Sequence, residues 1–85
     1  MHAYATLADE TTIAFSDVLD DGSVEVLIER PTDEGFDSAR YSVPSLARLA
    51  SSGFSATDLG ELDSFVARHA PIISGLARDR GLAYT

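Results

Sequence analysis

The spacing of apolar residues changes once along this chain, at Pro44. Before Pro44, apolar and polar residues alternate in short runs, which is typical of strands with one buried face. After it, apolar residues recur at steps of three and four, as on one side of an amphipathic helix. The change predicts an α+β fold: a three-stranded antiparallel meander over residues 11–43, packed on one face by a helical half over residues 44–81.

The first two strands are expected to form a hairpin that turns at Asp21-Gly22, because both central positions of such a two-residue loop need positive φ angles. This turn would place Phe15 opposite Ile28 and leave Glu25 and Glu29 on the other face. A slip of one residue would exchange the two faces. The predicted core face of the hairpin carries Ile13, Phe15, Asp17, Leu19, Val24, Val26, Ile28 and, at its end, Arg30.

Pro31 should end the second strand, because proline cannot donate a hydrogen bond to a neighbouring strand. Residues 32–37 are then expected to form a loop that reverses the chain, and residues 38–43 alternate again as a third strand. That strand would leave an open sheet edge, although Arg40 on it tends to discourage pairing. Residues 3–8 alternate weakly, so residues 1–10 either add a short fourth strand or stay flexible.

The helical half is expected to contain a short helix over residues 44–52, stopped by Gly53, and a longer C-terminal one. Ser55 is a good N-cap for the longer helix, with Asp58 in place of the usual Glu or Gln of a capping box. Pro71 predicts a kink or a break near His69-Ala70, and Gly81 should end the helix. The apolar stripe of this helix consists of Leu59, Leu62, Val66, His69, Ile73 and Leu76.

The chain is expected to form one domain, because 85 residues are too few for two hydrophobic cores. It contains no cysteine, which excludes disulfides, zinc–thiolate sites and thiol catalysis. No apolar run approaches the roughly 20 residues of a transmembrane helix. The first ten residues lack the features of a secretory signal. We therefore expect a cytoplasmic protein.

Acidic residues are concentrated in the front of the chain. Residues 1–37 contain ten acids and a single arginine, whereas residues 38–85 contain four acids and five arginines. A surface this negative repels phosphate backbones and anionic lipids, so neither nucleic acid nor membrane is an expected partner. The acidity either keeps the protein soluble or provides a docking face for a basic protein partner.

No signature of a catalytic nucleophile, a phosphate-binding loop or a dinucleotide-binding turn occurs in the sequence. His2 lies near the terminus, and His69 lies on the apolar stripe, where a structural bond to a helix carbonyl is expected rather than a general base. The acids between Asp33 and Asp37 are too closely spaced for a calcium-binding loop. We therefore predict a non-catalytic protein with no metal and no cofactor.

Two polar residues are unusual in their predicted positions. Asp17 would be costly on the core face without a partner, so it should lie at the rim or bond to Arg40, Tyr41 or a helix N-terminus. Arg30 could clamp the acidic loop or present its guanidinium to a partner. The candidate interaction or structural polar residues are Asp17, Arg30, Asp33, Glu34, Asp37 and Arg40.

The segment from Ile28 to Arg40 reads Ile-Glu-Arg-Pro-Thr-Asp-Glu-Gly-Phe-Asp-Ser-Ala-Arg. It resembles a segment of a family of small bacterial proteins of uncharacterised activity. In that family an acidic hairpin and this loop precede a Gly-Phe-Ser boundary, here Gly53-Phe54-Ser55, and a C-terminal helix. The resemblance covers residues 12–80 and implies a bacterial domain, with no reaction and no catalytic residues.

Three functions are compatible with these features. The leading hypothesis is a small protein-interaction module that self-associates through the open sheet edge. The second is an acidic regulator whose carboxylates take the place of phosphates on a basic nucleic-acid-binding protein. The third is a small-ligand protein or enzyme in which four side chains converge on a pocket under the helices: Asp17, Arg30, Tyr41 and His69.

Overall fold

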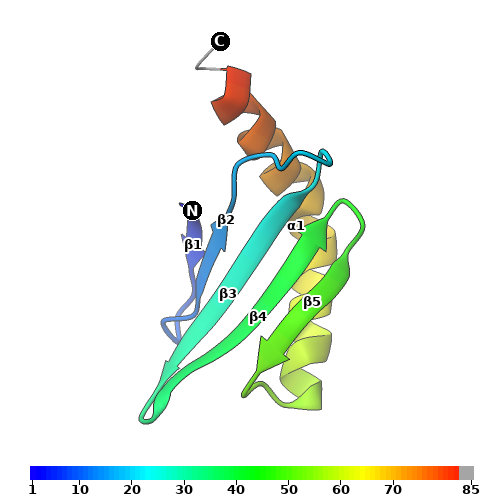
Figure 1. Ribbon diagram of the computed structural model, residues 1–85. Coiled ribbons are helices and arrows are strands. Elements are labelled where there is room, and N and C mark those ends of the chain that lie inside the picture. The colour runs from blue at the N-terminus through cyan, green and yellow to red at the C-terminus, as the bar shows by residue number, and fades with distance from the viewer. Residues whose placement is uncertain (83–85) are drawn as a thin grey trace.

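A computed structural model describes residues 1–82 as a five-stranded antiparallel sheet covered on one face by a single helix (Figure 1). The strands follow one another across the sheet in chain order. The α+β class is as predicted, but the expected three strands and two helices are wrong. The elements are β1 (His2–Thr6), β2 (Thr12–Phe15), β3 (Val24–Thr32), β4 (Gly35–Val43), β5 (Ala47–Ser52) and α1 (Ala56–Leu82).

The extra strand β5 takes the place of the predicted short helix over residues 44–52. Leu46 has a φ of 66°, which is incompatible with a right-handed helix, and its amide closes the turn by donating to the Ser42 carbonyl at 2.8 Å. Neither Leu46 nor Leu49 joins the core, so their three-residue spacing marked no buried helix face. In a segment this short, the spacing of apolar residues cannot distinguish a helix from a strand. Its conformation is determined by pairing with the edge of β4.

The β2–β3 hairpin has the predicted faces but another register. Phe15 pairs with Val26 rather than with Ile28, a shift of two residues. Because side chains alternate with a period of two, this shift leaves the same residues on the core face. The strand ends at Phe15, so Asp17 and Leu19 lie in the connection to β3 and are exposed. Ending there avoids the cost of burying the Asp17 carboxylate between apolar neighbours.

Asp21-Gly22 still turns the chain, at the far end of that connection. Gly22 has a φ of 84°, and Asp21 Oδ1 accepts a 3.0 Å hydrogen bond from the Ser23 amide. The place of the turn was therefore predicted correctly, but its type was wrong. Of Asp21 and Gly22, Gly22 alone has a positive φ, and its amide closes the turn by donating to the Leu19 carbonyl at 2.8 Å. The assumption that both strands extend up to the turn was wrong, because residues 16–23 form a longer connection.

The β3–β4 hairpin is longer than predicted. It turns at Asp33-Glu34, so the expected loop over residues 32–37 is wrong, and Pro31 lies within β3 opposite Phe36. Proline is tolerated there because β2 pairs with β3 no further than Glu29, which leaves this part of β3 at a free edge. The N-terminal residues form β1, the additional strand that was one of the two expectations for residues 1–10. The register of its pairing with β2 is irregular between Ala3 and Ala5.

The helix α1 begins at the predicted capping box. The Asp58 amide donates to Ser55 Oγ at 3.1 Å, and the Ser55 amide donates to Asp58 Oδ2 at 3.4 Å. The helix then continues through Pro71 without a break and runs to Leu82, so a break at Pro71 and an end at Gly81 are both wrong. Among residues 1–82, no helix is both long and apolar enough to cross a bilayer.

The core lies between α1 and the sheet. On α1 the buried hydrophobic positions are Val66, Ala70, Ile73 and Ala77, whereas Leu76 of the predicted stripe is 41% exposed. The two alanines allow the helix backbone to approach the sheet closely, which a stripe of larger side chains would prevent. The core residues contributed by the sheet are Ile13, Phe15, Val24, Val26, Ile28, Ala39, Tyr41 and Val43.

Candidate functional site

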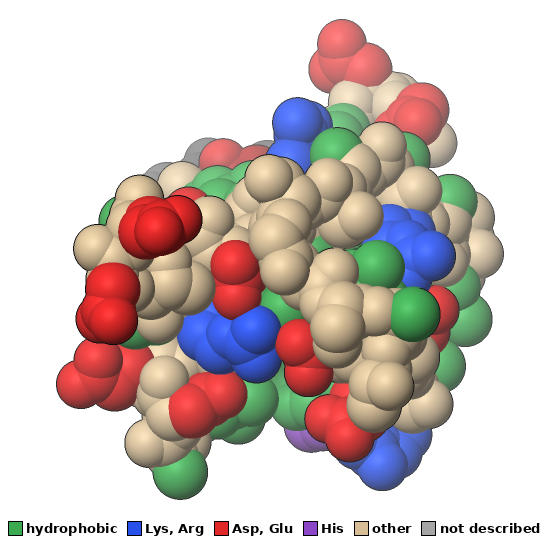
Figure 2. All heavy atoms as spheres, turned by 90° about the horizontal axis from the view of Figure 1, so that it is seen from below, with side chains coloured by type: hydrophobic (Ala, Val, Ile, Leu, Met, Phe, Trp, Pro, Cys, Tyr) green, Lys and Arg blue, Asp and Glu red, His purple; other side chains and the backbone are tan. Residues whose placement is uncertain are grey.

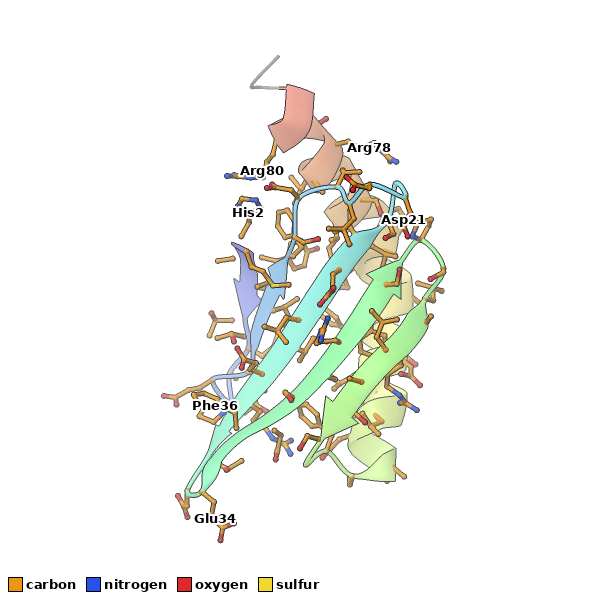
Figure 3. All side chains as sticks on the ribbon, in the orientation of Figure 1. His2, Asp21, Glu34, Phe36, Arg78 and Arg80 are labelled. Carbon is orange, nitrogen blue, oxygen red and sulfur yellow. The ribbon has the colours of Figure 1, made fainter. Side chains whose placement is uncertain are left out.

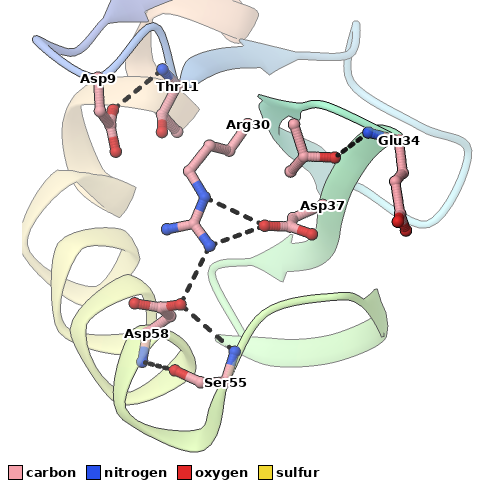
Figure 4. A network of polar contacts seen from close by, with 8 residues as sticks. Asp9, Thr11, Arg30, Glu34, Asp37, Ser55 and Asp58 are labelled. Carbon is pink, nitrogen blue, oxygen red and sulfur yellow. Dashed lines mark hydrogen bonds and ion pairs between the residues drawn. The ribbon is translucent and has the colours of Figure 1, made fainter.

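The structure ties β3, β4 and the start of α1 together through Arg30 (Figure 4). Its Nε and Nη2 atoms donate to Asp37 Oδ2 at 3.1 and 2.7 Å, and Nη2 also donates to Asp58 Oδ2 at 3.2 Å. The guanidinium lies 4.8 Å from the centre of the Phe54 ring, within cation–π range. Of the two roles considered for Arg30, its geometry is that of a clamp, with Asp37 as its main partner.

The charges of this cluster compensate one another. The hydrogen bond from Ser55, and after it the bond from Arg30, lowers the pKa of Asp58 below its usual value. Figure 2, which views this end of the molecule, shows basic side chains set among acidic ones. A guanidinium already held by two carboxylates and an aromatic ring has a structural role, because it joins two strands to the helix N-terminus.

The other acidic candidates are exposed. Asp33 and Glu34 form the tip of the β3–β4 hairpin, where Figure 3 also places Phe36, which is 66% exposed. The Asp17 side chain is 79% exposed and lies 2.6 Å from His2 Nε2, and this hydrogen bond lowers the pKa of Asp17. Neither Arg40 nor Tyr41, two of its expected partners, contacts it.

The four side chains of the predicted ligand site are not brought together. Asp17 pairs with His2 and Arg30 with Asp37. Tyr41 donates a 2.5 Å hydrogen bond to Asp63, which also accepts a bond from Arg48. Each side chain is satisfied at a different place, so this particular constellation forms no site.

His69 belongs to an aromatic cluster under β1. Its Nδ1 lies 2.7 Å from the Tyr4 hydroxyl, and its ring stacks on Phe65 with 4.1 Å between the centroids. The sequence suggested a helix carbonyl as the partner of His69. The sequence does not predict Tyr4 as the partner, because it does not decide whether residues 3–8 form a strand.

The edge strand β5 is the largest feature that the sequence did not reveal. All six of its residues are exposed, and β4 is its only pairing partner within residues 1–82. The signal that could have found it is the serine content of the segment, with Ser45, Ser51 and Ser52, because serine competes for backbone hydrogen bonds and disfavours helix interiors.

The chain around β5 contains no acidic residue. Residues 38–57 hold two arginines and no Asp or Glu, whereas the rest of the chain holds 14 acids and four arginines. Arg40 pairs with Glu25 across the open face of the sheet, and Arg48 pairs with Asp63 of α1. The β5 edge is therefore close to neutral on a protein whose net charge is −8.

Within residues 1–82, no group of three or more histidine, aspartate or glutamate side chains is placed to hold a metal ion. Comparisons of the chain with family models, curated proteins and solved structures find no match. The resemblance of the segment from Ile28 to Arg40 to a bacterial family stays a prediction.

Proposed function

We propose that this protein is a non-catalytic interaction module that self-associates by pairing β5 with the β5 strand of a second copy. The observation that carries the proposal is the full exposure of β5 along an edge of the sheet. An edge strand presents unpaired backbone amides and carbonyls, which a second strand can satisfy.

The charge distribution supports β5 over the opposite edge. Two copies of a chain with net charge −8 repel each other wherever their acids approach within about 8 Å at physiological salt. The β5 edge brings no carboxylate of its own strand into such a contact. The other edge strand, β1, contains His2, which pairs with Asp17. It is followed by a turn that contains two more acids, Asp9 and Glu10.

Symmetry also favours β5 with β5. Antiparallel pairing about a two-fold axis perpendicular to the sheet gives a closed dimer, because the β5 edge of each copy is occupied by the other and no further copy can add there. It would join two five-stranded sheets into one, with both α1 helices on the same face. Leu49, which is 52% exposed on β5, would lie at the junction and lose contact with water.

Sedimentation equilibrium over a concentration series tests the proposal. We expect a reversible monomer–dimer equilibrium that added salt strengthens or leaves unchanged, because screening weakens the repulsion between acidic copies. A strictly monomeric protein at high micromolar concentration would refute self-association. Association that salt weakens steeply would contradict the neutral edge as its basis.

A further inference from the structure

A pocket of about 400 Å³ lies where the β2–β3 connection and the β4–β5 turn meet the middle of α1. Its volume falls within the range of small-molecule sites. The walls on the loop side include Val18 and Leu46, and α1 contributes Ala70, Pro71, Ser74 and Arg78. Figure 3 shows Arg78 at the same end of the molecule as Asp21, away from the end that carries Glu34.

The walls of the pocket leave apolar surface in contact with water. Val18 is 39% exposed and Leu46 is 43% exposed, although both are large aliphatic side chains. They stand in two separate loops on the same pocket, so one apolar molecule placed between them would remove both from water.

Two polar groups of α1 in this pocket have no partner among residues 1–82. Ser74 is only 7% exposed, and its hydroxyl forms no hydrogen bond within residues 1–82. Buried hydroxyls are nearly always bonded, so an orphan beside a pocket points to an absent partner. Arg78 follows one helical turn later and forms no ion pair with residues 1–82; it is also the only charged residue of the pocket lining.

We propose that this pocket binds a small monocarboxylate with an apolar chain. The carboxylate would pair with the Arg78 guanidinium and accept a hydrogen bond from Ser74, after rotation of the serine about its single side-chain torsion. The chain would lie over Ala70 and Pro71, between Val18 and Leu46. Asp20 and Asp21 in the adjoining loop disfavour a second negative group on the ligand.

Titration of the full-length protein with octanoate, followed by amide NMR shifts, tests this assignment. We expect saturable shifts that centre on the loops of Val18 and Leu46 and on α1 around Ser74. Octanol, with the same chain and no charge, should bind at least about tenfold more weakly, since a charge-assisted hydrogen bond is lost. Equal affinities for octanoate and octanol, or the absence of saturable shifts, would overturn the proposal.

Three variants locate the carboxylate. Arg78→Gln and Ser74→Ala should each weaken octanoate binding, Arg78→Gln by about tenfold or more. Arg68→Gln is the matched control, because it makes the same change on α1 outside this pocket and should bind octanoate as the unmodified protein does. Unchanged affinity in Arg78→Gln, or an equal loss in Arg68→Gln, would refute Arg78 as the carboxylate ligand. Ser74 and Arg78 lie on α1 and not on β5, so the binding result with these variants can be read separately from the test of self-association.

Discussion

The hydroxyl of Tyr41 donates a 2.5 Å hydrogen bond to Asp63 Oδ1, and this contact joins the centre of the sheet to the first half of α1. Tyr41 is 1% exposed, so its phenol is shielded from water. Burial, and after it the neighbouring Asp63, raises the pKa of Tyr41 from 10.0 to about 12. The contact therefore makes the fold sensitive to alkaline pH.

Tyr41→Phe should lower the free energy of unfolding at neutral pH by about 1–2 kcal/mol, because one hydrogen bond to a charged acceptor is lost. In the unmodified protein, stability should fall as pH rises from 10.0 toward about 12, since the unfolded phenol loses its proton before the folded one does. Urea denaturation across that interval should show a smaller decline for Tyr41→Phe. An equal decline in stability with pH for the two proteins would show that ionisation of Tyr41 is not the cause.

The capping box at the start of α1 should contribute measurably to stability. Ser55→Ala removes the oxygen that accepts the Asp58 amide hydrogen and should lower the free energy of unfolding by about 1 kcal/mol. Ser55→Thr keeps a hydroxyl at the same position and should restore most of the loss. Chemical denaturation of the three proteins measures the effect, and equal stability of all three would exclude a role for this cap.

Gly53 and Gly22 provide a matched pair for testing close packing at the Arg30 clamp. Both have positive φ angles, 91° and 84°, but a Cβ on Gly53 would collide with the Asp37 carboxylate, whereas one on Gly22 would meet nothing within 4 Å. Gly22→Ala should lower the free energy of unfolding by about 1 kcal/mol, because alanine is strained in the left-handed backbone conformation. Gly53→Ala should cost clearly more, because Asp37 must move away from Arg30. Thermal unfolding of the two variants compares their stability. Similar losses of stability would show that Asp37 can move aside at little cost.

Ser74→Ala should raise the free energy of unfolding by about 1 kcal/mol, because it removes a buried hydroxyl that has no partner within residues 1–82. The same change should weaken octanoate binding. A gain in stability together with a loss of binding is the expected signature of a polar group kept for a ligand. Lower stability of Ser74→Ala in urea denaturation would show that the hydroxyl is already satisfied in the free protein.

Leu49→Lys should abolish self-association, since a lysine on an edge strand must lose hydration when a second strand pairs there. Ile72→Lys is the control: Ile72 is 53% exposed, against 52% for Leu49, and lies on α1 away from the sheet edge. Both substitutions add one positive charge. Sedimentation of the two variants should give a monomer for Leu49→Lys and the unmodified equilibrium for Ile72→Lys. Dimerisation of both would place the interface elsewhere.

The sequence predicted best where local chemistry decides the structure. The alternation around Val26 and Ile28 identified their buried face, and Ser55 with Asp58 identified the start of α1, because neither depends on distant residues. The register of Phe15 was wrong by two residues, since both pairings bury the same side chains and the length of the connection decides between them.

Features that depend on contacts between distant segments could not be predicted. Strand β5 forms because β4 offers an edge to residues 47–52, which a single segment cannot reveal. The helix buries Ala70 and Ala77 instead of His69 and Leu76, because its distance from the sheet favours small side chains. The pocket at Ser74 could not be predicted from a sequence motif either, because its walls come from three separate parts of the chain.

The order of the elements has a consequence for synthesis on the ribosome. Each strand pairs with its immediate neighbour in the chain, so the hairpins close short loops and can form early. Within residues 1–82, however, their apolar face is covered only by α1, which follows all five strands in the chain. Until Val66 and Ile73 have emerged, a nascent sheet would keep Phe15, Val26 and Ile28 open to other chains, and chaperone contact would be most needed in that interval.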